Sequence, residues 1–566
     1  MSKNECFLIL GGAGLVGRQI AREIAKKLSP RQIVIASLRQ DEVEDALGEL
    51  RSLFQDNPVA WDGCWGNIFV REDFAQVPRG EMLGSQANRD ALFDDLYGEM
   101  EPAYNTSYLV QMLRRHRPDV IVDCINTATA ISYQDAHTAS IVARREDAAF
   151  LAALDAGEVP ANRDETRYAF DLLVLSQALP QLVRHVQILH RVMNEVETRL
   201  YLKIGTTGSG GMGLNIPYTH SEDKPSVKLM TKTAVAFAHT GLMFLMARTP
   251  ESTIVKEIKP GGMIGYADVS CRLVKERGQQ VYVYNSRVQP VDGTLTLRED
   301  AEQYQCIRTL ELPVVDTGEN GLFTRGEFEA ITALRQMEFI TPEEIAREAV
   351  LEIVGSNTGH DVIAEIDSAI MNPTYRAGYL RQQVLADMTH LEASAGTYSV
   401  ALGQLGPPEL SKLLWEAELL RIEYGSLAAV LDQQPDAISR QVHDRLLRDD
   451  DLTRLITSIG LPVLSPDGIE LIRGPFIRIP EVPGVNEVQL GPADVDRYAA
   501  KGWVDLRPAN FDKWQNRFAI MLGERQRTRG RGSAALTRQA YLFDDIRIGE
   551  IAGWIFNNEE DGYRIK

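Results

Sequence analysis

Cys6-Phe-Leu-Ile-Leu-Gly-Gly-Ala-Gly-Leu-Val-Gly17 is the stretch that decides the fold of the first part of the chain. Residues 6–10 are apolar and predict a buried strand, and residues 18–26 have the apolar spacing of an amphipathic helix. The glycines between them fit both G-x-G-x-x-G and G-x-x-G-x-x-G spacing. Glycines let the backbone turn tightly and approach a pyrophosphate, while a helix N-terminus offers free N–H groups. The stretch therefore predicts a dinucleotide-binding turn, with cofactor contacts from Gly11, Gly12, Gly14, Leu15, Val16 and Gly17.

The composition is that of an ordinary globular protein. The 566 residues are 44% hydrophobic and 25% charged, and their net charge of −19 argues against a nucleic-acid-binding surface. The one basic cluster, residues 525–531, is interpreted as a solvated loop. The five cysteines lie far apart without C-x-x-C spacing, which indicates reduced thiols, gives no metal signature and favours a cytoplasmic location. We expect neither a signal peptide nor a membrane span.

The end of the second strand bears on cofactor preference. Gln32-Ile-Val-Ile-Ala-Ser37 is rich in β-branched residues and predicts that strand. The residue after it meets the adenosine ribose in dinucleotide-binding folds, where an acidic side chain favours NAD and a basic one holds a 2′-phosphate. Arg39 stands there, so we expect NADP(H) to be favoured over NAD(H). Two alternatives stay open: Arg39 pairs with Asp41 or Glu42 on the surface, or Asp41 serves an NAD ribose.

Strand and helix signals alternate through the first 370 residues, which predicts an α/β fold with a Rossmann-type doubly wound parallel sheet. Residues 67–70 predict the third strand, followed by Asp73 as an adenine contact. Residues 118–125 predict a buried strand that ends in three small or polar residues expected beneath the nicotinamide ribose: Asn126, Thr127 and Ala128. The stretch before the next strand is longer than a crossover needs, which indicates a helical insertion at about 131–165. Residues 199–204 and 252–258 predict two further strands.

In this order the pieces resemble the extended short-chain dehydrogenase/reductase family, which includes sugar-nucleotide epimerases and dehydratases. The resemblance covers residues 4–370 and rests first on Gly11, Gly14 and Gly17, which match the family's cofactor glycines. The segment 126–128 stands where the family has small residues after the fourth strand. Residues 259–265 are similar to the family's Arg-Pro-Gly segment, which implies cofactor contacts from Pro260, Gly261 and Gly262. Residues 339–347 resemble a late helix of the family, and residues 359–366 its last strand.

The resemblance also implies where catalysis takes place. Thr206 and Thr207 resemble the family's paired hydroxyl residues, so Thr207 is expected to hold the substrate oxygen, with Ser209 as a second candidate. In the family a tyrosine and a lysine lie four residues apart on one helix, and the lysine lowers the tyrosine's pKa. Lys232 matches the lysine and would orient the nicotinamide ribose, but Lys228 stands at the tyrosine position.

Three explanations of this departure stay open. Lys228, partly neutral beside a second cation, moves the proton; Tyr218 in the preceding loop supplies the phenol; or the site binds a dinucleotide without turnover. His220 in the same loop is interpreted as an exposed side chain, and His239 on the lysine's helix as a packed one.

The resemblance thus implies an atypical NADP(H)-dependent oxidoreductase that acts on a carbonyl/alcohol substrate, with epimerisation or dehydration as related outcomes. Its implied partners are a small-molecule substrate and a second copy of the chain in a homodimer, with no nucleic acid. The alternative is a catalytically silent dinucleotide-binding regulatory or scaffold protein. Residues 1–370 are expected to form the dehydrogenase-like domain, and residues 371–566 an additional, mainly α-helical domain of unknown role. Four tryptophans of that second part are expected in its core: Trp415, Trp503, Trp514 and Trp554.

Overall fold

The computed structural model describes residues 5–132, 136–206, 227–249, 253–276, 279–291, 293–318, 321–333, 339–356, 358–364, 370–371, 374–404, 407–482, 484–537 and 539–559. These residues form two compact units. Unit 1 comprises the described residues within Met1–Gly211, Pro225–Ile264 and Ile340–Pro373, and unit 2 those within Gly265–Phe339 and Thr374–Lys566. Residues 265–339 therefore group with unit 2, although they precede the boundary that we expect at residue 370.

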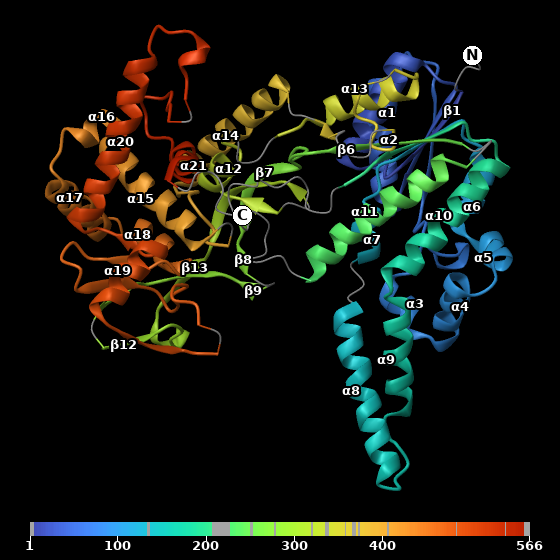
Figure 1. Cartoon of the computed structure of the whole chain (residues 1–566), viewed down its shortest axis with the longest axis horizontal. Helices are drawn as coiled ribbons and strands as arrows, with labels where there is room; N and C mark the ends of the chain where they lie inside the picture. Colours follow the sequence, from blue (N-terminus) through green and yellow to red (C-terminus); the bar gives the residue numbers. More distant parts are fainter. Residues whose placement is uncertain are drawn as a thin grey trace. The chain divides into compact units, whose positions relative to one another are not determined.

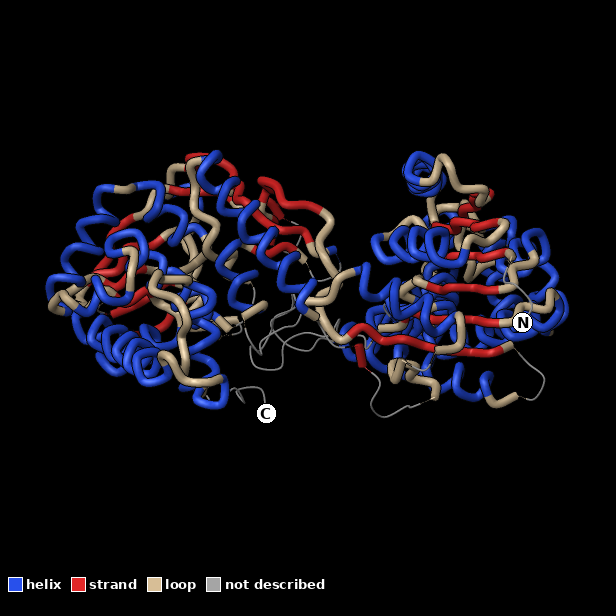
Figure 2. Tube along the Cα trace, turned by 90° about the horizontal axis from the view of Figure 1, so that it is seen from above, coloured by secondary structure: helices blue, strands red, loops and turns tan. Residues whose placement is uncertain are grey.

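A parallel sheet forms the centre of unit 1 (Figure 2). Among the described residues it has seven strands in the order β16-β6-β5-β4-β1-β2-β3. The strands are β1 Cys6–Leu10, β2 Gln32–Ser37, β3 Ala60–Trp65, β4 Val120–Asp123, β5 Leu200–Ile204, β6 Ile254–Pro260 and β16 Ile370–Met371. The order reverses next to β1, which is the arrangement of a Rossmann fold and confirms the predicted fold class.

Helices cover both faces of this sheet (Figure 1). On one face lie α1 Leu15–Leu28, α2 Gln40–Leu53 and α13 Pro342–Ile353, and on the other α6 Tyr108–His116, α10 Ala178–Glu195 and α11 Val227–Ala247. Alternate strand residues serve the two faces: Phe7 and Ile9 pack toward α1, while Leu8 and Leu10 pack toward α10. Buried strands that face apolar layers on both sides are what a parallel sheet requires.

Two strands differ from their predicted positions. The third strand is Ala60–Trp65 and not residues 67–70, which follow it as a loop. Asp62 and Gly63 have low strand propensity, so the sequence pattern does not predict β3. The apolar residues after it instead predict a strand that is not formed. The last strand of the sheet is Ile370–Met371; the described residues of 359–366 form a loop and turns.

The crossover between β4 and β5 is helical. It holds α7 Thr127–Ser132, α8 Ala136–Asp155 and α9 Arg163–Leu175 before α10. Figure 1 shows α8 and α9 side by side as a pair that extends away from the sheet of unit 1. The crossover between β3 and β4 holds η1 Glu72–Phe74, α3 Arg79–Gly84, α4 Gln86–Tyr97, α5 Met100–Thr106 and α6.

Unit 2 combines short strands with many helices. Its strands are β7 Asp268–Leu273, β8 Lys275–Glu276, β9 Gln279–Gln280, β10 Tyr282–Tyr284, β11 Arg287–Pro290, β12 Gly293–Thr296, β13 Cys306–Thr309, β14 Glu311–Asp316, β15 Leu322–Phe323, β17 Val463–Leu464, β18 Glu470–Arg473, β19 Glu487–Leu490 and β20 Val504–Asp505. Its helices are α12 Arg325–Ile331, α14 Tyr375–Ala395, α15 Pro408–Tyr424, α16 Leu427–Leu431, α17 Pro435–Arg448, α18 Asp450–Ser458, α19 Pro492–Lys501, α20 Pro508–Thr528 and α21 Ile548–Glu559. Antiparallel pairs join β11 to β18 and β12 to β19, which ties residues 287–296 to residues 470–490.

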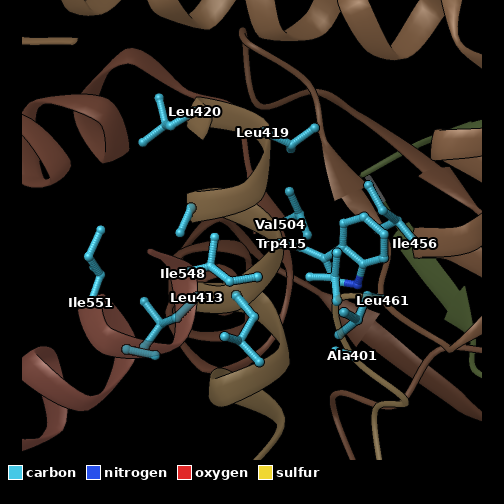
Figure 3. Close-up of a cluster of buried hydrophobic side chains, with 14 of the residues drawn as sticks. Ala401, Leu413, Trp415, Leu419, Leu420, Ile456, Leu461, Val504, Ile548 and Ile551 are labelled. Atoms are coloured by element: carbon cyan, nitrogen blue, oxygen red, sulfur yellow. The ribbon is translucent and has the colours of Figure 1, made fainter. Parts of the chain in front are cut away.

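Helix α15 runs through the core of unit 2. Residues 410–420 of this helix are all buried, and Figure 3 shows Leu413 and Trp415 among apolar side chains such as Val504 and Ile548. The helix also buries Glu416, which accepts hydrogen bonds from Trp514 Nε1 at 2.8 Å and from Lys412 Nζ at 3.1 Å. The four tryptophans expected in this core are buried.

The basic cluster at residues 525–531 differs from its predicted loop. Residues 525–528 form the last turn of α20, where Arg525 pairs with Asp544 and Arg527 with Glu524. In the described part of the chain, none of the helices combines the length and the apolar character needed to cross a lipid bilayer.

Candidate active site

The glycines in the turn between β1 and α1 lie where a side chain would meet neighbouring backbone. Gly11 has a φ of +70°, and a Cβ there would lie 3.1 Å from the carbonyl carbon of Cys124. A Cβ on Gly17 would lie 2.6 Å from Cα of Gly12, so the first turn of α1 packs directly on the loop. Gly14 N–H donates to Gly11 O at 3.1 Å and ends the loop at the start of the helix. The predicted strand–turn–helix is therefore present, with Leu15 and Val16 as the first two residues of α1.

A cavity of about 620 Å³ opens beside this turn, within unit 1. Its lining includes Gly11, the residues that follow β2 and β3, and residues of several helices, among them α3, α4 and α10. The carboxyl ends of parallel strands are where open α/β sheets bind their ligands. Among the described residues, those with charged side chains that line the cavity are four arginines and one aspartate: Arg39, Arg71, Arg79, Arg184 and Asp95. A positive lining in a chain of net charge −19 suits a phosphate-bearing ligand.

The two residues predicted to contact the adenosine have different positions in the structure. Arg39 lines the cavity, directly before α2, and its guanidinium pairs with Asp41 and lies 4.0 Å from Glu42. Asp73 lies in η1, is exposed and is not among the residues that line the cavity. β3 ends at Trp65, and the residues that follow it directly include Asn67, which does line the cavity.

A buried lysine holds the segment that we expect beneath the nicotinamide ribose. Lys203 on β5 lies 2.9 Å from Asp123 Oδ2 at the end of β4. Its ammonium donates to Ile125 O at 2.6 Å and to Thr127 Oγ1 at 3.1 Å. Tyr201 OH donates to the same Asp123 oxygen at 2.6 Å, and burial raises the pKa of this phenol well above its usual value. These bonds fix the backbone on either side of Asn126, with Thr127 and Ala128 in the first turn of α7.

A second buried ion pair holds the start of the loop that follows β5. Lys259 Nζ on β6 lies 2.8 Å from Glu257 Oε1 and donates to Thr206 O at 2.8 Å. A Cβ at Gly205 would collide with Glu257 Oε1, so a larger residue at the exit of β5 would have to displace the Glu257 carboxylate. Burial raises the pKa of Glu257, and the neighbouring Lys259 opposes this shift. The predicted Pro260, Gly261 and Gly262 follow directly, at the end of β6 and after it.

Two buried histidines lie near these ion pairs. His185 on α10 lines the cavity, and its ring packs 4.7 Å from that of Phe69. Burial lowers the pKa of His185 to about 4, so its imidazole is neutral at physiological pH. His239 on α11 is buried as predicted, and burial lowers its pKa well below the usual value, assisted by the positive charge of Lys203. Within the described part of the chain, the Nε2 atoms of both histidines are buried without a hydrogen-bond partner.

The catalytic candidates are only partly covered by the described residues. Lys228 and Lys232 both belong to α11, one helical turn apart, and Lys232 is half-buried. The side chain of Lys228 lies outside the described part, as do Thr207, Ser209, Tyr218 and His220. Their roles remain predictions.

The sequence interpretation did not identify Asn67, Arg79, His185 or Lys203 as site residues. A charged residue inside an apolar strand, as in Leu-Tyr-Leu-Lys203-Ile, is a signal that could have indicated Lys203, because a lysine is rarely buried without a partner. The other three come from loops and helices whose position around the cavity depends on tertiary packing.

Residues 281–560, all within unit 2, match the family model described as "Beta-methylindole-3-pyruvate reductase C-terminal domain". A comparison with curated proteins gave no match.

Among solved structures, the chain is similar to Pen from Bacillus thuringiensis, at 12% identity over 45% of this chain and 49% of that one, with a TM-score of 0.21. The Bordetella bronchiseptica enzyme WbmG, in complex with NAD and UDP, is 11% identical over 46% of this chain and 54% of that one, with a TM-score of 0.22. YwfH, an NADPH-dependent reductase involved in bacilysin biosynthesis, is 11% identical over 43% of this chain and 66% of that one, with a TM-score of 0.21. The chain thus spans about half of the length of the first two structures.

Proposed function

We propose that the protein is an NADP(H)-dependent oxidoreductase that transfers a hydride to or from a carbonyl/alcohol substrate. The observation that carries this proposal is the turn Gly11–Gly17, whose glycines pack closely on neighbouring backbone and which adjoins an arginine-lined cavity at the carboxyl edge of the sheet. A dinucleotide needs both features, because its pyrophosphate approaches the turn and its adenosine occupies a pocket beside it. NADP(H) is favoured over NAD(H) because arginines outnumber carboxylates in the lining of the cavity.

The proposed chemistry uses the residues around the ends of β4, β5 and β6. The cofactor, when bound, supplies or accepts the hydride. Lys203 holds the 125–127 segment in place for the ribose, and Lys259 holds Thr206 at the start of the loop that follows β5. Lys232 orients the nicotinamide ribose, Thr207 holds the substrate oxygen with Ser209 as its alternative, and Tyr218 or Lys228 moves the proton.

The substrate class follows from the family whose model matches unit 2. Its description names a reductase of a 2-oxo acid that carries an indole ring. We therefore propose an aryl-substituted 2-oxo acid as the first substrate to test, with reduction of the keto group as the reaction.

The test is a fluorescence titration of the purified chain with NADPH and NADH, followed by NADPH oxidation assays with indole-3-pyruvate. We expect micromolar binding of NADPH, weaker binding of NADH and oxidation of NADPH that depends on the 2-oxo acid. No binding of either nucleotide would exclude an oxidoreductase.

A second candidate function is that of a catalytically silent dinucleotide-binding regulatory or scaffold protein. The lysine at position 228, where the resembled family has its tyrosine, favours this candidate. Binding of NADPH without turnover of any carbonyl substrate, in the wild type and in Lys228→Tyr, would identify it.

A further inference from the structure

The four arginines of the cavity differ in the bonds they already make. Arg71 donates to both carboxylate oxygens of Asp95, at 2.8 and 2.7 Å, and to Ala91 O at 3.1 Å. Arg184 donates to Leu96 O and Gly98 O, the carbonyls at the end of α4. These two guanidinium groups hold helices together, and a ligand would have to compete with those bonds.

Arg39 is also bonded, and to carboxylates. Its Nε donates to Asp41 Oδ1 at 2.9 Å, its Nη2 pairs with the other oxygen, and Glu42 lies at 4.0 Å. A phosphate that arrives at Arg39 would therefore meet two negative charges together with the positive one. Because like charges at short range repel, Arg39 in this arrangement is a weak phosphate ligand.

Arg79 is different. It is the first residue of α3, it is exposed, and it lines the same cavity as Arg39. Within the described part of the chain its guanidinium has no hydrogen bond and no ion pair with protein. Neighbouring atoms desolvate it and lower its pKa, and no carboxylate offsets this effect. Five N–H donors that match the geometry of a phosphate are thus available at the cavity.

We propose that Arg79 binds the 2′-phosphate of NADP(H) and is the residue that decides cofactor preference. This inference rests on the proposed dinucleotide binding and makes it more specific. Residues that follow β2 and β3, where a Rossmann fold holds the adenosine, line the cavity, and Arg79 belongs to the same lining. A charge-assisted bidentate pair between arginine and phosphate gives both affinity and selectivity for the phosphorylated cofactor.

The experiment is isothermal titration calorimetry with two matched pairs of probes, NADPH against NADH and adenosine 2′,5′-bisphosphate against 5′-AMP. The chain is compared with Arg79→Ala, Arg79→Lys and Arg39→Ala, and with Arg144→Ala as a control that removes an equally charged, exposed side chain on α8. We expect Arg79→Ala to weaken the binding of NADPH and of the bisphosphate about 10- to 100-fold, since the substitution removes a hydrogen-bonded charge pair. The dissociation constants of NADH and 5′-AMP should change less than about threefold. For NADPH, the dissociation constant of Arg79→Lys should lie between those of the wild type and Arg79→Ala. Because Arg79 makes no hydrogen bond or ion pair with the residues that the structure describes, its variants should unfold at the wild-type temperature.

The outcomes separate this inference from the proposed function. If the wild type binds none of the four probes, dinucleotide binding itself is wrong. If it binds NADH at least as tightly as NADPH, or if Arg79→Ala weakens both members of a pair equally, the cavity serves a dinucleotide but Arg79 does not read the 2′-phosphate. If only Arg39→Ala lowers the preference for NADPH, the residue after β2 has that role and the assignment to Arg79 is overturned.

Discussion

Lys203 and Asp123 form a buried ion pair across neighbouring strands, with 2.9 Å between Nζ and Oδ2. The pair lies at the carboxyl edge of the sheet, and Tyr201, the carbonyl of Ile125 and the hydroxyl of Thr127 complete its hydrogen bonds. Buried charges are costly to desolvate, and breaking one such pair leaves an uncompensated charge in the protein interior. The pair therefore links the stability of unit 1 to the shape of the site.

Lys203→Met is expected to destabilise unit 1 by about 3–5 kcal/mol, because Asp123 stays buried without its cation. The double variant Lys203→Met/Asp123→Asn should lose less free energy of unfolding than the sum of the losses of the two single variants, because no unpaired charge remains buried. Differential scanning calorimetry checks this, with the transition of unit 1 identified as the one that NADPH shifts. Additive losses would show that the two side chains do not interact.

Gly17→Ala is expected to abolish nucleotide binding. Its Cβ would lie 2.6 Å from Cα of Gly12, so the turn has to move away from the helix. Gly48→Ala on α2 is the matched control, because a Cβ there meets no atom within 4 Å and alanine favours a helix by about 1 kcal/mol over glycine. NADPH titration should show loss of binding in the first variant and wild-type affinity in the second. Retained affinity in Gly17→Ala would contradict the close packing of turn and helix.

His185→Leu is expected to raise the stability of the free protein and to weaken the bound state. The unpartnered Nε2 of His185 costs about 1–3 kcal/mol in the free protein, and a cavity ligand that bonds to it recovers this cost. His116→Leu is the control, since its Nε2 is also buried without a partner in the described residues but His116 does not line the cavity. Melting temperatures with and without NADPH measure both effects. A ligand-induced shift in His185→Leu equal to that of the wild type would exclude a role in binding.

The stability of unit 2 is expected to fall as the pH rises through neutrality. Burial raises the pKa of Glu327 from 4.5 to about 7. An acid with a raised pKa binds its proton more tightly in the folded state, so its contribution is complete below pH 4.5 and is lost as the pH rises through 7. The resulting loss in the free energy of unfolding is roughly 3 kcal/mol. Chemical unfolding between pH 4.5 and 8 should show this slope in the wild type and a smaller slope in Glu327→Gln. The exposed Glu487→Gln should leave the slope unchanged.

Much of the sheet of unit 1 could be predicted from the sequence. Apolar and β-branched runs predict β1 and the strands at Gln32–Ser37 and Leu200–Ile204, because a strand buried on both faces has little room for polar residues. β3 departs from that pattern with Asp62 and Gly63, and the misplaced strand also led to the expected contact at Asp73, which is not among the residues that line the cavity, whereas Asn67 is.

The composition of the site could be predicted only in part. Glycine spacing is local and identifies the turn, whereas Lys203 and Asp123 are 80 residues apart and meet only because β4 and β5 are neighbours. Arg79 and His185 reach the cavity from two separate helices, and no short motif records that meeting. The roles of Thr207 and Ser209 in the loop after β5, and of Tyr218 in the loop before α11, remain predictions from the resemblance alone.

The pairing of β11 with β18 and of β12 with β19 has a consequence for synthesis on the ribosome. Arg298 bonds to Asn486, 188 residues further along the chain, so the early strands of unit 2 emerge long before their partners exist. At translation rates of about 5–20 residues per second, the wait lasts about 10–40 s. During that time the edges of β11 and β12 are open to other nascent chains, which makes chaperone capture at this stage an advantage. A chain that stops after residue 371 would leave these strands without partners for good, so unit 1 is best produced with residues 265–339 replaced by a short linker.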